Sequence, residues 1–333
     1  MNGTMQFDGC RCLVTGGGGF IGSHLVERLA RAGARVRAFI RYTSRDDAGF
    51  LCLAPPEVRN SVEVVAGDVR DADAIRRAAE GCDIIFHLAA LIAIPYSYRH
   101  PREVVETNVL GTLNILEAAR IHGVRRLVHT STSEVFGTAR NVPIDESHPL
   151  QGQSPYSASK IGADKIVESY WRSFSVPAVT IRPFNTYGPR QSARAVIPAI
   201  ITQALAGDRI RLGNLESTRD FTFVSDTVEA FALAGTVEGI EGEEINLGTG
   251  AEISIGKLVE AIGRRLGAEL TVSCDEQRLR PRLSEVNRLL ADNRKAGRLL
   301  GWSPRVSLDE GLDATIRWVR ENTGFYKPGE YQI

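Results

Sequence analysis

A tyrosine and a lysine stand one helical turn apart in the stretch YSASK, where Tyr156 and Lys160 occupy positions i and i+4. On an α-helix these positions share a face. A lysine ammonium beside a phenol stabilises the phenolate, so the pair predicts that Tyr156 acts as a general base near neutral pH, well below its ordinary pKa of about 10. The spacing alone is common, and a pair on a helix surface is the alternative.

A glutamate follows a predicted buried strand in LVHTSTSEVFG, residues 127–137. Leu127 and Val128 are β-formers, and small or polar residues lead from them to Glu134. A carboxylate at the end of a buried strand costs free energy unless it has partners or a chemical task. One possibility is that Glu134 has a chemical task, which this stretch alone does not define. The alternative is a structural carboxylate that caps a loop or pairs with a nearby arginine.

A glycine-rich turn, VTGGGGFIG, places Gly16, Gly19 and Gly22 between a predicted first strand and first helix. Glycines permit a tight turn and let backbone N–H groups approach a pyrophosphate at the helix N-terminus. The spacing is G-x-x-G-x-x-G and departs from the usual G-x-G-x-x-G. Because it follows a strand and opens a helix, the turn predicts dinucleotide binding.

Residues after the next two strands bear on the kind of dinucleotide. The position that often carries an acid for the adenosine ribose reads FIRYTSR, with Arg41 and Arg45 instead. Arginine there can receive the 2′-phosphate of NADP, and a solvated basic turn is the alternative, so NAD and NADP both stay open. Asp68, after the third strand, could accept a hydrogen bond from the adenine amino group, and Val69 could pack on the ring.

The elements that position these residues alternate between strand and helix patterns through the first half of the chain. This alternation predicts an α/β fold with a doubly wound, parallel Rossmann-type sheet over residues 1–186, joined by segments that return near 220–250. Residues 187–333 are predicted to form mainly a smaller C-terminal α/β lobe that binds substrate, with a cleft between the lobes. The expected strands cover 10–16, 34–40, 62–68, 82–90, 125–131 and 177–184, and the expected helices 20–33, 72–81, 101–123 and 156–175.

Composition excludes several classes of function. Forty basic and forty acidic residues cancel, which leaves no global field for nucleic acid or an anionic membrane. Five cysteines without a C-x-x-C pair argue against a disulfide framework and a structural zinc site, so no metal is expected. The N-terminus shows no signal-peptide pattern, and the longest apolar run is shorter than the ~20 residues of a spanning helix. We expect a soluble, cytoplasmic protein with no nucleic-acid or membrane partner.

Together the motifs resemble the extended short-chain dehydrogenase/reductase superfamily, whose members act on nucleotide sugars. TGGGGFIGSHL, GDVRD, FHLAA, TNVLGTLNILEAA, TSTSEVFG, PYSASK, RPFNTYGP, RDFTFVSD and NLGTG occur in the family's order, over nearly the whole chain. The resemblance implies a nucleotide-sugar substrate, a tightly held NAD or NADP that is recycled, and a homodimer formed through helices 101–122 and 155–174. The implied cofactor contacts are Gly16, Gly19, Phe20, Ile21, Gly22, Arg41, Asp68, Val69, Leu88, Ala89, Ala90, Asn108, Tyr156, Lys160 and Pro183.

Within this superfamily, the stretch Thr132-Ser133-Glu134 separates activities. Sugar 4-epimerases usually carry Ser or Thr there with no acid two residues on. The 4,6-dehydratases carry Thr-Asp-Glu or Thr-Ser-Glu, and UDP-glucuronate decarboxylases also use Thr-Ser-Glu. HLAALIAIPYSYRHP and RLRPRLSEVNRLLADN are similar to bacterial 4,6-dehydratases that feed legionaminic-acid and related amino-sugar pathways. The resemblance therefore favours a 4,6-dehydratase, with UDP-N-acetylglucosamine as its expected substrate, over a decarboxylase or a 4-epimerase.

The resemblance also assigns roles. Tyr156 would take the proton of the sugar 4-hydroxyl, which Thr132 orients, and Glu134 would take the C5 proton and help expel the C6 hydroxyl. Ser133 stands where the commoner pattern has an aspartic acid, so Glu134 would serve as base and then acid, or a water would relay the proton. The residues expected at the sugar diphosphate are Asn185, Arg219 and Arg280, with Arg282 as an alternative to Arg280.

Two further classes stay open at this point. A dinucleotide sensor without catalysis could use the same fold, although such sensors often lose the tyrosine that this chain keeps. An ordinary reductase would consume NADPH, whereas internal hydride transfer needs no added oxidant.

Overall fold

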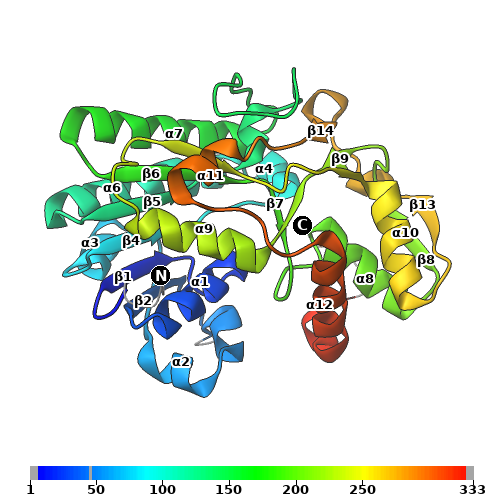
Figure 1. Cartoon of the computed structure of the whole chain (residues 1–333), viewed down its shortest axis with the longest axis horizontal. Helices are drawn as coiled ribbons and strands as arrows, with labels where there is room; N and C mark the ends of the chain where they lie inside the picture. The colour runs from blue at the N-terminus through cyan, green and yellow to red at the C-terminus, as the bar shows by residue number, and fades with distance from the viewer. Residues whose placement is uncertain (1–6, 45–46, 328–333) are drawn as a thin grey trace.

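The computed structural model describes residues 7–44 and 47–327. Its centre is a seven-stranded parallel sheet with the order β11-β6-β5-β4-β1-β2-β3 (Figure 1). This sheet confirms the predicted doubly wound α/β fold. Its strands are β1 (Arg11–Thr15), β2 (Arg35–Arg41), β3 (Glu63–Gly67), β4 (Ile84–His87), β5 (Arg126–Thr130), β6 (Ala178–Pro183) and β11 (Glu244–Leu247).

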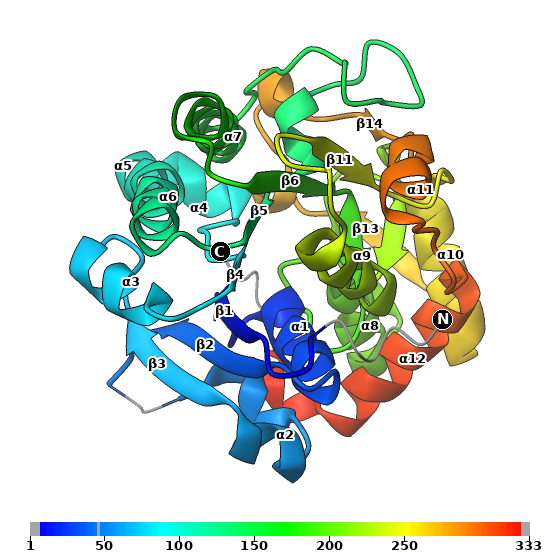
Figure 2. The ribbon, with the colours of Figure 1, turned by 60° about the vertical axis from the view of Figure 1, so that its left-hand side comes forward.

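Helices cover both faces of the sheet (Figure 2). On one face lie α3 (Ala72–Ala79), α6 (Gly111–His122) and α7 (Pro155–Phe174), over a core that includes Leu13, Ile85 and Leu127. On the other face lie α1 (Phe20–Arg31) and α9 (Val224–Thr236), over a core that includes Val14 and Phe86. Between β2 and β3 run a short helical turn, η1 (Gly49–Leu53), and α2 (Pro56–Ser61).

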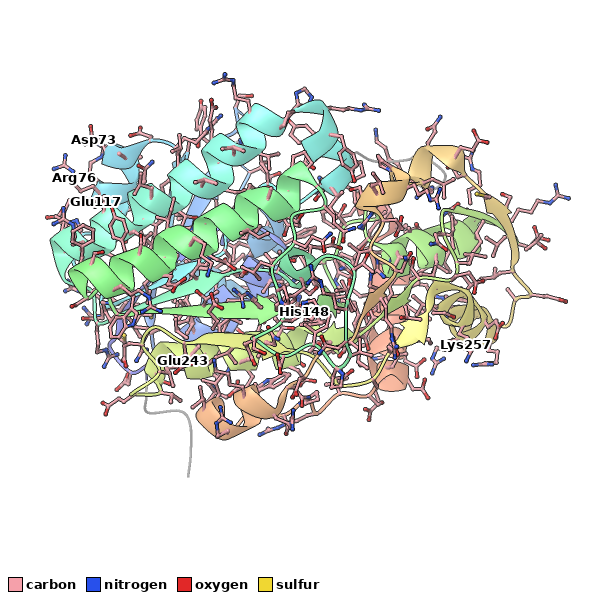
Figure 3. All side chains as sticks on the ribbon, turned by 90° about the horizontal axis from the view of Figure 1, so that it is seen from above. Asp73, Arg76, Glu117, His148, Glu243 and Lys257 are labelled. Atoms are coloured by element: carbon pink, nitrogen blue, oxygen red, sulfur yellow. The ribbon has the colours of Figure 1, made fainter. Side chains whose placement is uncertain are left out.

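Helix α7 is defined by its own sequence. Ser154 forms a reciprocal capping box with Ser157, and Pro155 stands at the first helical position, where its missing N–H costs nothing. Seen from above, α7 lies along α6, and the labelled Glu117 lies on α6 at the end far from Lys257 (Figure 3). The hydroxyl of Tyr170 on α7 donates to the Glu117 carboxylate at 2.5 Å. The cap defines the start of the helix, where the YSASK stretch lies.

The helix expected over 101–123 is not a uniform α-helix. It comprises α5 (Pro101–Val105), a π-helical turn η2 (Glu106–Leu110) and α6, preceded by α4 (Ile94–Arg99). The predicted long helix is therefore present, with one wider turn at 106–110 that hydrophobic spacing does not report. Asn108 lies inside this turn and is buried.

The second lobe is built from helices around short strands. Its three helices are α8 (Val196–Ala206), α10 (Ile255–Leu266) and α12 (Leu308–Glu321), and residues such as Ile200, Leu258 and Leu312 fill a core of their own. The short strands pair as β8 with β13, as β7 with β10, and as β9 with both β12 and β14. Their bounds are β7 (Asn185–Tyr187), β8 (Arg209–Leu212), β9 (Thr218–Arg219), β10 (Phe221–Phe223), β12 (Ile253–Ser254), β13 (Thr271–Cys274) and β14 (Arg288–Leu289). The remaining turns are η3 (Ser133–Phe136), η4 (Glu276–Arg278), η5 (Arg282–Ser284) and η6 (Thr323–Phe325).

The chain passes between the lobes several times. After β10 it returns as α9 against α1, and β11 then extends the main sheet beside β6, with Glu244 opposite Thr180. The next return is α11 (Arg294–Leu300), which packs on α9 and β11. The buried Asp220 joins these passages, because its carboxylate accepts hydrogen bonds from the N–H groups of Gly250 and Ala291. Both lobes therefore contribute to one contact region at the carboxyl ends of the strands.

In the part of the chain that the structure describes, no helix has the length and apolarity that crossing a bilayer requires.

Candidate active site

Tyr156 and Lys160 lie on the buried face of α7, where they are 7% and 4% exposed. The Lys160 ammonium donates to the backbone carbonyl of Thr130, the last residue of β5, at 2.5 Å. This bond anchors the lysine at the end of the central strand. The helix and the sheet together bring the predicted pair to the carboxyl edge of the sheet.

Burial opposes the lowering of the Tyr156 pKa that the YSASK spacing predicts. Burial raises this pKa above its ordinary value; a hydrogen bond from the Thr132 hydroxyl offsets part of the rise, and the charges of Glu134 and Asp164 add to it. Burial also lowers the pKa of Lys160 to about 8, although the Asp164 carboxylate opposes that change. Burial thus acts against the charged form of both side chains in the chain without ligands.

A buried network lies one helical turn beyond Lys160. The Asp164 carboxylate accepts hydrogen bonds from the Ser131 hydroxyl at 2.6 Å and from the Arg182 guanidinium at 3.0 Å, and His129 Nε2 lies 3.2 Å from it. Burial opposes ionisation, but the His129 hydrogen bond and the Arg182 charge hold the pKa of Asp164 below its ordinary value. A fixed negative charge thus lies one helical turn from Lys160.

The TSTSEVFG stretch forms a tight turn directly after β5. The Thr132 hydroxyl caps η3 by accepting the backbone N–H of Glu134 at 3.2 Å, and Ser133 is buried. The Glu134 carboxylate lies 3.4 Å from the Arg280 guanidinium. The arginine pairing that was the alternative explanation for Glu134 is thus present, and its partner is the residue expected at the diphosphate.

The glycine-rich turn has the shape of a dinucleotide cradle. Gly16 adopts φ +72°, a left-handed conformation that favours glycine, and an added Cβ would stand 3.0 Å from the backbone nitrogen of Ala89. At Gly22 a Cβ would come within 2.1 Å of the Gly16 carbonyl oxygen. The first turn of α1 begins after Gly19, with no side chain capping its N–H groups. The turn and the end of β4 therefore leave uncapped backbone N–H groups of the kind that a pyrophosphate binds.

The other residues predicted at the cofactor lie at the ends of several elements of the main sheet. Phe20 and Ile21 open α1, Leu88, Ala89 and Ala90 follow β4, and Pro183 ends β6. Asn108 links the segment after β4 to α7, because its side chain bonds both backbone groups of Leu91 and donates to the Ser159 hydroxyl at 2.9 Å.

At the outer edge, the exposed Arg41 ends β2 and lies 3.5 Å from Glu103. Asp68 pairs with Arg70 at 2.6 Å, and Val69 is buried beside Gly111. Arg45 lies outside the described residues. These contacts do not distinguish NADP, which carries a 2′-phosphate, from NAD, which carries a ribose hydroxyl at that position.

The residues predicted at the diphosphate come from separate loops. Arg219 is buried and donates to the carbonyls of Thr218 and Val286 at 2.9 and 2.7 Å, and Asn185 donates to the Asp220 carbonyl at 3.3 Å. Arg280 faces Glu134, whereas Arg282 is exposed. The structure thus brings Arg280, and not Arg282, to the turn that carries Glu134.

The chain is similar to known proteins over nearly its whole length. The family model of the GDP-mannose 4,6 dehydratase matches residues 13–315. The chain belongs to this family. It lies within the larger group of nucleotide-sugar dehydratases and epimerases that the sequence motifs indicated.

Family members with different activities resemble the chain to a similar degree. A UDP-glucose 4-epimerase of Mycolicibacterium smegmatis is 38% identical over 94% of this chain and 99% of its own. A dTDP-glucose 4,6-dehydratase of Streptomyces niveus is 33% identical over 96% and 95%. The solved structure of the Streptomyces venezuelae dTDP-glucose 4,6-dehydratase DesIV, with NAD and TYD bound, covers 95% of this chain and 99% of its own at a TM-score of 0.85 and 35% identity. Overall similarity therefore assigns the family but does not distinguish between these activities. The residues of the site must distinguish them.

Sequence reasoning missed Asp164, Arg182 and the pairing of Glu134 with Arg280. The first could have been found, because Asp164 continues the spacing of Tyr156 and Lys160 by another turn of the same helix. Across residues 7–44 and 47–327, no group of three or more His, Cys, Asp and Glu side chains is arranged to hold a metal ion.

Proposed function

We propose that this protein is a nucleotide-sugar 4,6-dehydratase that converts UDP-N-acetylglucosamine to the 4-keto-6-deoxy sugar. The observation that carries the proposal is the position of Glu134. It follows Thr132 in one tight turn, and its charge acts on the phenol of Tyr156. An acid at this place has a task in elimination and none in simple epimerisation.

The cofactor of the proposed reaction is NAD or NADP, which would take hydride from C4 and return it to C6. The residues that would hold it are the glycine turn and the segment after β4, whose backbones approach too closely for a side chain at Gly16 or Gly22. The NAD of DesIV supports this assignment. Lys160 would bring positive charge to the same region.

Tyr156 and Glu134 would carry out different proton transfers. Tyr156 takes the proton of the 4-hydroxyl, with Thr132 holding that hydroxyl and hydrogen-bonding the phenol. Glu134 takes the C5 proton and delivers it to the C6 oxygen, which leaves as water, because Ser133 is too weak an acid for this step. C5 then needs a new proton, and the one that Tyr156 received from O4 balances the reaction.

The nucleotide would lie between the lobes. Arg219 and Arg280 would hold its diphosphate, for which a planar guanidinium is suited. Uridine is favoured because several similar structures carry UDP sugars, including an enzyme named MoeE5 with UDP-glucose and a Methanobrevibacter ruminantium UDP-N-acetylglucosamine 4-epimerase with UDP-N-acetylmuramic acid.

A second candidate is a 4-epimerase, supported by the 38% identity to the M. smegmatis enzyme and by the TM-score of 0.87 to the Methanothermobacter thermautotrophicus epimerase Mth375. Such an enzyme would use Tyr156 and Lys160 and leave Glu134 without a chemical step. A UDP-glucuronate decarboxylase is the remaining alternative, because it shares the Thr-Ser-Glu pattern.

Mass spectrometry of the products from a panel of UDP-, dTDP- and GDP-sugars, without added cofactor, tests the proposal. The expected result is loss of one water from UDP-N-acetylglucosamine. Loss of carbon dioxide from UDP-glucuronate would assign a decarboxylase, and an unchanged mass with altered retention would assign an epimerase. Conversion that stops at one turnover would indicate a net reductase.

A homodimer through α6 and α7 accompanies this proposal. Leu110, Ile121 and Phe174 on or beside these helices are large apolar side chains that are about half exposed in the single chain. Sedimentation of the protein at several concentrations tests it, with a monomer as the contrary result.

A further inference from the structure

Two groups expected to serve different steps contact each other. Glu134 lies directly after β5 of the main sheet, and Arg280 lies between η4 and η5 of the second lobe. The Arg280 Nη1 atom is 3.4 Å from Glu134 Oε2 and 3.5 Å from Oε1. The side chains are only 24% and 14% exposed, so water screens the pair weakly. The residue expected to act as the base, Glu134, therefore pairs with Arg280, the residue expected to bind the diphosphate.

The second arginine is held differently. Arg219 donates to the carbonyls of Thr218 and Val286, and the Glu285 carboxylate lies 3.9 Å from it. Among the described residues, the guanidinium of Arg280 has hydrogen bonds only to Glu134. Arg219 is thus fixed by the backbone, whereas Arg280 is held by a side chain that can be replaced.

Charge makes this replacement favourable. Arg219, Arg280, Glu134 and Glu285 form a neutral group of two cations and two anions, and the diphosphate of a nucleotide sugar adds two negative charges. Beside the phosphates, Glu134 would repel the ligand while it held one of the cations that the ligand needs. The long 3.4 Å contact to Glu134 is weaker than a charge-assisted bond of about 2.8 Å, which a phosphate oxygen could form.

We propose that Arg280 exchanges Glu134 for the substrate diphosphate, so that the base is released only when a nucleotide sugar is bound. This inference rests on the proposed function, and it explains why the enzyme would act on nucleotide sugars and not on free sugars. A free hexose or a nucleoside would leave the Glu134–Arg280 pair in place. Binding free energy from the remote diphosphate would thereby be used to prepare the reacting end of the substrate.

The test measures binding without turnover, by calorimetric titration of UDP into the wild-type protein and Glu134→Gln. If Glu134 competes with the diphosphate, the variant binds UDP about tenfold more tightly, equivalent to ~1.4 kcal/mol. Glu134→Ala provides a second variant without the carboxylate. Circular dichroism confirms that each variant is folded. Glu243→Gln is the control, because it removes a carboxylate from the ion pair with Lys295 at the far edge of the sheet and should leave UDP affinity unchanged.

A double-mutant cycle assigns the effect to the pair. In an Arg280→Gln background, Glu134→Gln should change UDP affinity by less than about twofold. Uridine, which has no phosphates, should bind every variant equally. Unchanged or weaker UDP binding by both Glu134 variants would overturn the exchange, and so would an equal gain in the Arg280→Gln background. Because product masses test the proposed function separately, a dehydratase with unchanged UDP affinity in Glu134→Gln would refute only the exchange.

Discussion

The two halves of the candidate site are built in different ways. Tyr156 and Lys160 share one capped helix, and the lysine is anchored to Thr130 at 2.5 Å with a buried ionic network behind it. Glu134 and Arg280 come from turns in different lobes and meet at 3.4 Å. Contacts within one helix and its sheet hold the first half, whereas the second half depends on a single contact between two lobes. Under the proposed function, relatives with different activities would share the first half, and the turn and loops of the second half would determine what happens to the oxidised sugar.

Removing the phenol tests the first half most severely. Tyr156→Phe should reduce turnover of the sugar nucleotide by about 10²–10⁴-fold, because the proposed reaction assigns the O4 proton to this phenol. Product formation measured by mass spectrometry checks this. Tyr170→Phe is the matched control on the same helix, since its hydroxyl contacts Glu117 far from the cradle and its loss should leave turnover nearly unchanged. Turnover at the wild-type rate by Tyr156→Phe would show that the first half has been misassigned.

Glu134→Gln should separate the two halves. The amide cannot accept the C5 proton, so dehydrated product should fall by about 10²–10⁴-fold while oxidation at C4 continues. Reduced cofactor should then accumulate, which absorbance shows directly. Dehydrated product formed at the wild-type rate would show that Glu134 is not the base of the elimination.

Arg219→Lys tests whether the backbone-fixed arginine binds substrate. A lysine cannot reproduce two parallel hydrogen bonds to a phosphate, so KM should rise by about tenfold with kcat little changed. Steady-state kinetics measure both constants. Arg282→Lys is the comparison at an exposed position and should alter neither. Equal effects of the two variants would remove Arg219 from the diphosphate site.

Asp164→Asn should produce the smallest change of these variants, a shift in the pH dependence of kcat/KM. Burial holds the pKa of Lys160 near 8, and the Asp164 charge opposes that lowering. If protonated Lys160 is required, wild-type kcat/KM declines above about pH 8, and removing the carboxylate lowers the pKa further, so the decline begins at lower pH. Glu168→Gln, on the exposed side of the same helix, should leave the profile in place. If the Asp164→Asn protein is folded and its kcat/KM declines at the same alkaline pH as the wild type, Asp164 has only a structural role.

The contrast between the two halves also explains what could be predicted from sequence. Tyr156 with Lys160, and Gly16 with Gly22, lie close in the chain, so local spacing reveals the helix and the turn that carry them. Glu134 and Arg280 are 146 positions apart, and no local pattern encodes their contact. Strands such as β9 and β14 have two residues each, too few to show any periodicity. The raised pKa of Tyr156 was also hidden, because burial depends on packing of the whole chain.

The return of the chain to form β11 has a consequence for engineering. A fragment that stops after residue 186 would lack both β11 and α9, leaving β6 as an open edge and the apolar side chains under α9 in water. Such a fragment is expected to aggregate. Recombination with a relative should therefore exchange loops and keep the threading of the backbone intact, so that new substrate preferences are introduced through the parts of the protein that its folding does not require.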